Sequence, residues 1–170
     1  AGTSSTTSSE LVRFKGTGDA VFGGTIYGRR PSGLLTMQGN ATGTTITTGG
    51  LFYKVAGTTI ASSLNGFTSP SSNRLTSGAT FSIIAAIDVA LTVSHNGVAA
   101  DEIQFALYKS GVQISNSIIS SVTGASINVN CNLNTMVSLA PTDYIELYCS
   151  HPTSAKVITV KNLQIKLSTT

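Results

Sequence analysis

The sequence predicts an all-β domain folded as a sandwich or barrel, and three observations support this fold class. Short segments repeatedly alternate apolar and polar residues with a period of two, which is typical of strands with one buried face. Glycine, asparagine, serine and threonine separate these segments. No stretch carries apolar residues at helical spacing over several turns. We therefore expect about eight to ten short strands in one domain.

The first half of the chain predicts several short strands and one long strand. The expected short strands, joined by polar connections, are Leu34–Met37, Thr44–Thr48 and Leu51–Gly57. Residues 80–93 are nearly all apolar, as expected of a strand covered on both faces, although their alanines also permit a helix.

The clearest hairpin signal lies in residues 102–115. The alternation in EIQFALY predicts a strand whose inward residues are Ile103, Phe105 and Leu107. Lys109–Gly111 predicts a tight turn, because glycine readily adopts positive φ. The returning strand is expected to be VQIS, with Val112 and Ile114 on one face.

Three later segments also alternate. SINVNCNLN, residues 126–134, predicts an outward asparagine ladder and the inward residues Ile127, Val129, Cys131 and Leu133. Residues 143–149 predict Ile145, Leu147 and Cys149 inward, with Tyr144, Glu146 and Tyr148 outward. In KVITVKNLQIKL, residues 156–167, the apolar residues change phase near Lys161–Asn162, which predicts a β-bulge.

The composition limits the classes of function. Charged residues make up 10% of the chain and hydrophobic residues 41%, and the net charge is +3 with the cations scattered. A nucleic-acid surface needs clustered cations, so this class is not expected. No transmembrane segment or signal peptide is visible. Residues 1–10 offer little to bury and are expected to form a mobile or partner-bound arm.

The stretch TDYIELYCSH, residues 142–151, gathers acids, a thiol and an imidazole and raises the question of an enzyme. Asp143 and Glu146 are three positions apart, so on a strand they face opposite sides of the sheet and form no acid–base pair. Asp143 is expected to cap a turn. His151 shares a face with Cys149 only if the strand continues past it. We therefore expect no enzyme and no catalytic residue.

The cysteines and histidines also have structural interpretations. Cys131 and Cys149 are expected to be small buried side chains, with a disulfide between neighbouring strands as the alternative. His95 and His151 lie on separate segments with few acids nearby, which is weak support for zinc. We expect no cofactor and no metal, with a metal shared by symmetry copies on a three-fold axis as the alternative.

Several motifs together resemble a known family. The strongest are FALYKSG (Phe105–Gly111) and LAPTDYIELY (Leu139–Tyr148), and the pieces between Ala20 and Leu167 follow in a matching order. On these motifs the chain resembles the TNF/C1q-like jelly rolls found in structural proteins of tailed bacteriophages. The resemblance implies a jelly-roll β-sandwich of about ten strands that assembles as a homotrimer. It divides the chain into residues 1–19, a partner-bound arm with the first strand, and residues 20–170, the jelly-roll domain.

The resemblance also implies a function. It indicates a viral structural protein, a trimeric decoration or cement protein that binds and stabilises a phage head. The expected partners are further copies of this chain and the major capsid protein, without nucleic acid or membrane. The protein is expected in the host cytoplasm before assembly and on the capsid exterior afterwards. The alternative is a receptor- or glycan-binding tip domain of a tail fibre or head fibre.

Position and residue type select the candidate contact residues. The expected capsid contacts lie in the arm and the first strands: Leu11, Val12, Arg13, Phe14, Arg29 and Arg30. For the adjacent arginines, a solvated turn is the alternative. Tyrosine combines apolar area with a hydroxyl that an interface can satisfy. The expected trimer-interface residues are therefore the outward tyrosines Tyr27, Tyr53, Tyr144 and Tyr148.

Overall fold

The alternating segments form β-strands throughout the part of the chain that the computed structural model describes, which is residues 13–14, 20–21, 30–98, 100–124 and 126–169. The strands in chain order are β1 (Arg13–Phe14), β2 (Ala20–Val21), β3 (Ser32–Met37), β4 (Thr44–Ile46), β5 (Tyr53–Lys54), β6 (Ile60–Asn65), β7 (Phe67–Thr68), β8 (Arg74–Ser77), β9 (Ile83–His95), β10 (Asp101–Lys109), β11 (Val112–Gln113), β12 (Ile119–Thr123), β13 (Val129–Leu139), β14 (Tyr144–Ser150) and β15 (Lys156–Thr169). These residues include no helix that could cross a membrane.

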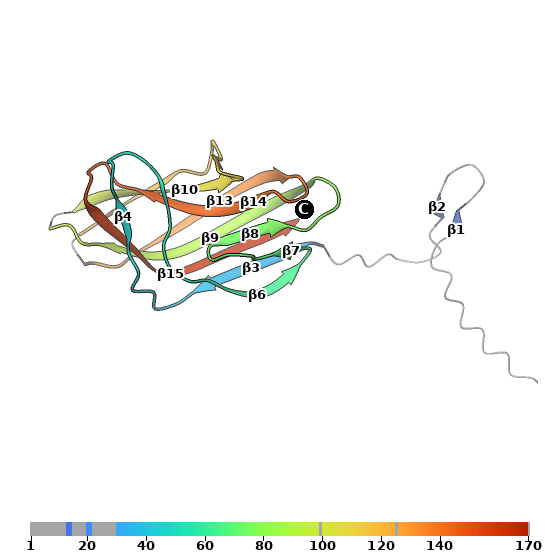
Figure 1. Ribbon diagram of the computed structural model, residues 1–170, viewed down its shortest axis with the longest axis horizontal. Coiled ribbons are helices and arrows are strands. Elements are labelled where there is room, and N and C mark those ends of the chain that lie inside the picture. Colours follow the sequence, from blue (N-terminus) through green and yellow to red (C-terminus); the bar gives the residue numbers. More distant parts are fainter. Residues whose placement is uncertain (1–12, 15–19, 22–29, 99, 125, 170) are drawn as a thin grey trace, which may run out of the picture.

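Two antiparallel sheets form the body of the molecule. The seven-stranded sheet has the order β11-β10-β14-β8-β7, with β12 paired to β10 and β5 paired to β14. The six-stranded sheet has the order β13-β9-β15-β3-β6, with β4 paired to β15. The long strands run along the long axis of the body (Figure 1). Strands β1 and β2 pair only with each other.

The core lies between the two sheets, because every second residue of the long strands faces inward. Strands β10 and β14 contribute fully buried side chains from one sheet, and β9 and β15 contribute them from the other. The largest fully buried side chains include Phe105, Leu147, Ile87 and Ile158. The expected inward residues of residues 102–108 and 143–149 are all buried, which confirms the inward side of both predictions.

The predicted turn and bulge are confirmed. Ser110 and Gly111 have φ angles of 49° and 82° and join β10 directly to β11, with Lys109 opposite Val112. In β15 the pairing to β9 shifts between Val160 and Asn162. Inward residues therefore occupy even positions before Lys161 and odd positions after it.

Three details of the sequence prediction are wrong. Ile127 is 59% exposed, because β13 begins only at Val129 and the residues before it form a turn. The strand expected over residues 112–115 is shorter, because β11 ends after Val112 and Gln113. The apolar segment 80–93 is not covered on both faces. Strand β9 alternates buried and exposed residues, and Ile84 is 55% exposed.

The sheets also contain more strands than the expected eight to ten. Pairings of only two residues, such as β5, β7 and β11, account for part of the difference. Such short pairings carry no alternation that a sequence pattern could reveal.

Candidate functional site

The outer face of the six-stranded sheet is the broadest regular surface of the described chain. Its residues are the outward members of four neighbouring strands, and we call it the open face. It consists of Asn130, Asn132, Asn134 and Met136 on β13, Ile84, Ala86, Asp88, Ala90 and Thr92 on β9, Asn162, Gln164, Lys166 and Ser168 on β15, and Ser32, Leu34 and Thr36 on β3.

Strand register aligns these side chains in rows across the sheet, as the pairing of antiparallel strands requires. One row crosses all four strands through Asn132, Ala90, Gln164 and Thr36. The next row crosses them through Asn134, Asp88, Lys166 and Leu34. The predicted asparagine ladder is thus confirmed from Asn130 onward, and it forms one side of a larger surface.

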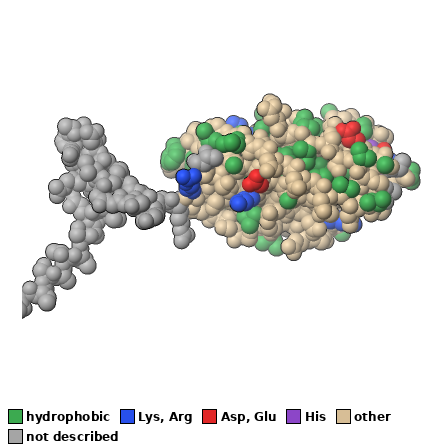
Figure 2. Space-filling view, turned by 180° about the vertical axis from the view of Figure 1, so that it is seen from behind, with side chains coloured by type: hydrophobic (Ala, Val, Ile, Leu, Met, Phe, Trp, Pro, Cys, Tyr) green, Lys and Arg blue, Asp and Glu red, His purple; other side chains and the backbone are tan. Residues whose placement is uncertain are grey.

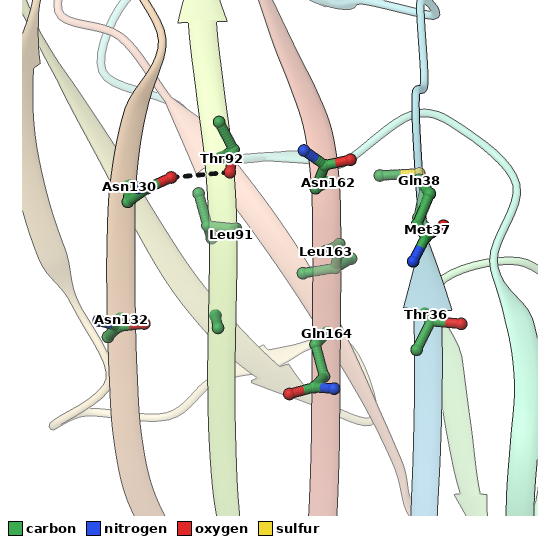
Figure 3. Close-up of a pocket in the computed structure, with 11 residues that line it drawn as sticks. Thr36, Met37, Gln38, Leu91, Thr92, Asn130, Asn132, Asn162, Leu163 and Gln164 are labelled. Atoms are coloured by element: carbon green, nitrogen blue, oxygen red, sulfur yellow. Dashed lines mark hydrogen bonds between the residues drawn. The ribbon is translucent and has the colours of Figure 1, made fainter.

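Small residues at the centre of the open face make it concave. Ala90 lies between the longer side chains of Asn132 and Gln164, and the resulting groove has a volume of about 540 Å³ (Figure 3). A second hollow of about 340 Å³ adjoins it above Asp88. The Thr92 hydroxyl donates to Asn130 Oδ1 at 2.8 Å across the two strands. The groove therefore presents carboxamides and hydroxyls, which both donate and accept hydrogen bonds.

The open face is nearly uncharged. Among its described residues only Asp88 and Lys166 are charged, and they occupy paired positions on β9 and β15. Ile84 and Met136 add exposed apolar area at one end, where they are 55% and 59% exposed. Figure 2 shows a face of the molecule on which neutral polar atoms surround small, separate apolar and charged patches. A surface of this composition suits contact with a protein better than contact with a polyanion.

The outer face of the seven-stranded sheet carries a cluster around Glu146. Glu146 was expected to be an outward residue, and its side chain is only 2% exposed, which corrects that expectation. Lys54 Nζ and Arg74 Nε donate to Glu146 Oε1 at 2.6 and 2.8 Å. Tyr148 donates to Glu146 Oε2 at 3.4 Å. Side chains from the neighbouring strands β5 and β8 thus cover a carboxylate that alternation alone placed in solvent.

The Glu146 carboxyl is held in its charged form. Its burial on its own would raise the pKa, but the hydrogen bonds and positive charges of Lys54 and Arg74 outweigh burial and hold the pKa below its usual range. The same contacts tie β14 to β5 and to β8. The cluster therefore joins three strands of the sheet.

The expected trimer-interface tyrosines are mostly occupied within the chain. Tyr148 stacks on Tyr108 with ring centroids 4.0 Å apart, and Arg74 lies 3.9 Å above the ring of Tyr144. Tyr53 accepts a hydrogen bond from the Thr48 amide at 2.9 Å and contacts the Thr47 hydroxyl, and these bonds lower its pKa. These three tyrosines are half-buried, while Tyr27 lies outside the described residues.

The acid and thiol of residues 142–151 do not converge. Cys149 faces the core and Glu146 faces the opposite side of the sheet. Burial raises the pKa of the Cys149 thiol to about 12, so at neutral pH it is protonated and poorly nucleophilic. Cys131 and Cys149 are both free and buried, in different sheets. Asp143 caps its turn as expected, accepting from the Ala140 amide at 2.9 Å.

The capsid-contact candidates fall mostly in the part of the chain that is not described. Leu11, Val12 and Arg29 lie outside the described residues. Arg13 and Phe14 form β1, and Arg30 is exposed before β3. The sequence reasoning missed the open face because it read each strand separately, although the polar residues of β13 and β15 were visible in the alternation.

Comparison with known proteins identifies the fold. No family model matches the sequence, and no curated protein is similar to it. Among solved structures, the Eiger TNF from S. frugiperda is similar with a TM-score of 0.55 and 11% identity, covering 83% of this chain and 94% of that one. PRD1 vertex protein P5 is similar with a TM-score of 0.53 and 11% identity, covering 84% and 98%.

The globular domain of a zebrafish complement C1qA protein is also similar, with a TM-score of 0.51 and 6% identity, covering 82% of this chain and 96% of that one. Identities this low establish the fold alone. The chain is an all-β, TNF/C1q-like jelly roll of two antiparallel sheets, and the fold expected from the motif resemblance is confirmed.

Proposed function

We propose that this TNF/C1q-like jelly roll is a viral structural protein, a homotrimer that decorates and reinforces a phage head. The observation that carries the viral part is the shared fold with PRD1 vertex protein P5, which spans 98% of that chain. The absence of converging catalytic groups around Glu146 and Cys149 agrees with a structural role.

The open face supports self-association. This surface extends over four strands, carries little charge and exposes Ile84 and Met136. Leaving such a surface in contact with water is less favourable than covering it with another protein surface. Its single acid and single base, Asp88 and Lys166, leave it nearly neutral, so a different surface of a neighbouring copy can pack on it without excess charge. Its carboxamides can bind donors or acceptors of that neighbouring surface, because each carries both. Packing copies around a closed three-fold ring would cover this face on every subunit.

Attachment to the capsid would use the N-terminal segment. We assign the contact to Leu11, Val12, Arg13, Phe14, Arg29 and Arg30, with a bound arm over residues 1–19 and the jelly roll over residues 20–170. Three copies of a weak contact on one trimer bind far more tightly than one copy, because the second and third contacts form within the complex. Bridging neighbouring capsid subunits in this way would reinforce the shell against internal pressure.

Electron microscopy of the parent virions tests the viral role and its location. Density for this jelly roll on the capsid lattice, in three-fold units, is the expected result. Density confined to the tail or to fibre ends would replace the decoration role by that of a receptor- or glycan-binding tip. The carboxamide groove above Ala90 favours this second candidate, because amides and hydroxyls match the hydroxyl groups of sugars.

Deletion of residues 1–11 tests the attachment. We expect the shortened chain to fold and to self-associate like the full chain, because the two sheets begin at β3. Its retention on virions stripped of the native protein should fall, measured by co-sedimentation with the particles. Equal retention of the full and shortened chains would remove the arm from the contact.

A further inference from the structure

The only two histidines of the chain lie buried together at one end of the sandwich. His95 ends β9 and is 3% exposed, and His151 follows β14 and is fully buried. Their ring centroids are 6.1 Å apart. The sequence separates them by more than fifty positions on segments that showed no common pattern. Two neighbouring buried imidazoles need a physical account, because histidine is the side chain that ordinarily changes charge near neutral pH.

The hydrogen bonds of His95 require its neutral form. The Gly97 amide donates to His95 Nδ1 at 2.9 Å, so this nitrogen carries a lone pair. His95 Nε2 therefore carries the proton and donates to the Thr123 carbonyl at 2.8 Å. A second proton on Nδ1 would point at the Gly97 N–H.

His151 has the opposite arrangement. Its Nδ1 lies 3.0 Å from the Thr153 amide and 3.1 Å from the Thr153 carbonyl, so it has both a donor and an acceptor within reach. Its Nε2 has no hydrogen-bond partner and lies 3.4 Å from Asp101 Oδ2. The charged form of His151 therefore finds an acceptor for each of its protons. Protonation of His151 Nδ1 exchanges the bond from the Thr153 amide for one to the Thr153 carbonyl, whereas among the described residues His95 Nδ1 has only the Gly97 donor beside it.

The surrounding charges act in the same direction. Among the described residues, the charged groups facing the two rings are Asp101 on β10 and Lys156 on β15, whose Nζ lies 3.3 Å from Asp101 Oδ2. Burial would raise the pKa of Asp101, but the hydrogen bond and charge of Lys156, with the two histidines, hold it below its usual range. With both rings charged, three cations would share one carboxylate. A charge on His95 would therefore have no carboxylate of its own to stabilise it.

We propose that His95 is a proton-sensitive contact that binds Gly97 and Thr123 at neutral pH and releases them on acidification. Its ring binds Gly97, just after β9, and Thr123, the last residue of β12, and its carbonyl accepts from the Ser126 amide at 3.1 Å. Val98 and Ile127, which are 96% and 59% exposed, lie next to Gly97 and Ser126. Release of Gly97 and Thr123 would change the apolar surface at this end while the two sheets stay folded. The inference does not depend on the proposed viral role.

Amide hydrogen exchange of the full chain tests the proposal. Between about pH 7.5 and about pH 5 we expect the protection of the Gly97 and Ser126 amides, corrected for intrinsic exchange, to fall by up to about tenfold per pH unit. Protection of Leu163, in the middle of the six-stranded sheet, should stay constant. His95→Gln should remove the pH response, because an amide side chain does not titrate, and the matched control His151→Gln should retain it.

Two results would overturn the proposal: constant protection of Gly97 in the wild-type chain, or a pH response that persists in His95→Gln. Wild-type NMR provides a second measurement if His95→Gln does not fold. The two imidazole signals are readily distinguished, and the loss of Gly97 protection should follow the titration of His95. A loss that follows His151 instead would reject His95 as the sensitive group.

Discussion

At the scale of single residues, Glu146 is a buried charged side chain that binds Lys54, Arg74 and Tyr148. Replacing it by glutamine keeps its shape and leaves Lys54 and Arg74 without their shared carboxylate. We expect Glu146→Gln to lower the free energy of unfolding by about 3 kcal/mol, as for other buried ion pairs that lose one partner. Urea denaturation measures this change. The matched control is Glu102→Gln on β10, whose exposed carboxylate should contribute little.

The stabilisation from Glu146 should depend on pH. Because its pKa in the folded chain is below its usual value, the unfolded chain takes up the proton first as the pH falls. The contribution is therefore complete above about pH 4.3, the ordinary glutamate value, and is lost as the pH drops through the lower folded value. Denaturation of wild type and Glu146→Gln at pH 7 and pH 3 should show a difference that shrinks in acid. An unchanged difference would contradict this assignment.

At the scale of elements, the bulge in β15 places backbone carbonyls where Asn40 can bind them. The Lys161 carbonyl accepts from the Asn40 amide at 2.9 Å, and the Asn40 side chain donates to Val160. The pairing with β9 skips Lys161, so its removal leaves the register intact. We expect deletion of Lys161 to give a folded chain that is less stable by about 1 kcal/mol, from the lost contacts to the β3–β4 connection.

Deletion of Gln164 is the matched control for that prediction. It would turn Ile165 and Leu167 from the core to the open face, because a shift of one residue reverses every later side chain. We expect this variant not to fold, by circular dichroism and thermal denaturation. Equal behaviour of the two deletions would show that the bulge is not the place where the extra residue is accommodated.

The strands that alternate strongly could be predicted from the sequence, including the shift of phase in β15. Alternation is a local property that needs only the strand itself. What could not be predicted depends on other strands. Glu146 is buried because β5 and β8 bring cations from far along the chain. The open face and the histidine pair depend on register between strands distant in sequence, which a single sequence does not encode visibly.

At the scale of the whole molecule, the proposed covering of the open face requires several copies of the chain to associate. We expect the full chain to sediment with about three times the 17.5 kDa of one copy. A single copy over a wide range of concentration would remove the trimer. This measurement is independent of any capsid, so it separates self-association from attachment.

A substitution in the centre of the open face tests where the copies meet. Ala90→Arg introduces a long charged side chain into the groove and should raise the dissociation constant of the assembly by at least about tenfold, or 1.4 kcal/mol. The control is Val122→Arg on β12, at the edge of the other sheet, where the side chain is 64% exposed. It should leave the assembly unchanged. Dissociation by Val122→Arg alone would place the contact on the seven-stranded sheet.

The position of β15 has a consequence for how the chain is made. This strand comes last in the described sequence, yet it lies between β9 and β3 in the six-stranded sheet. During synthesis, β3 and β9 emerge from the ribosome long before the strand that joins them. The sheet cannot close until residues near Thr169 have left the exit tunnel, and its non-local pairing makes folding slow. Until then the apolar side of β9 must be kept from premature contacts.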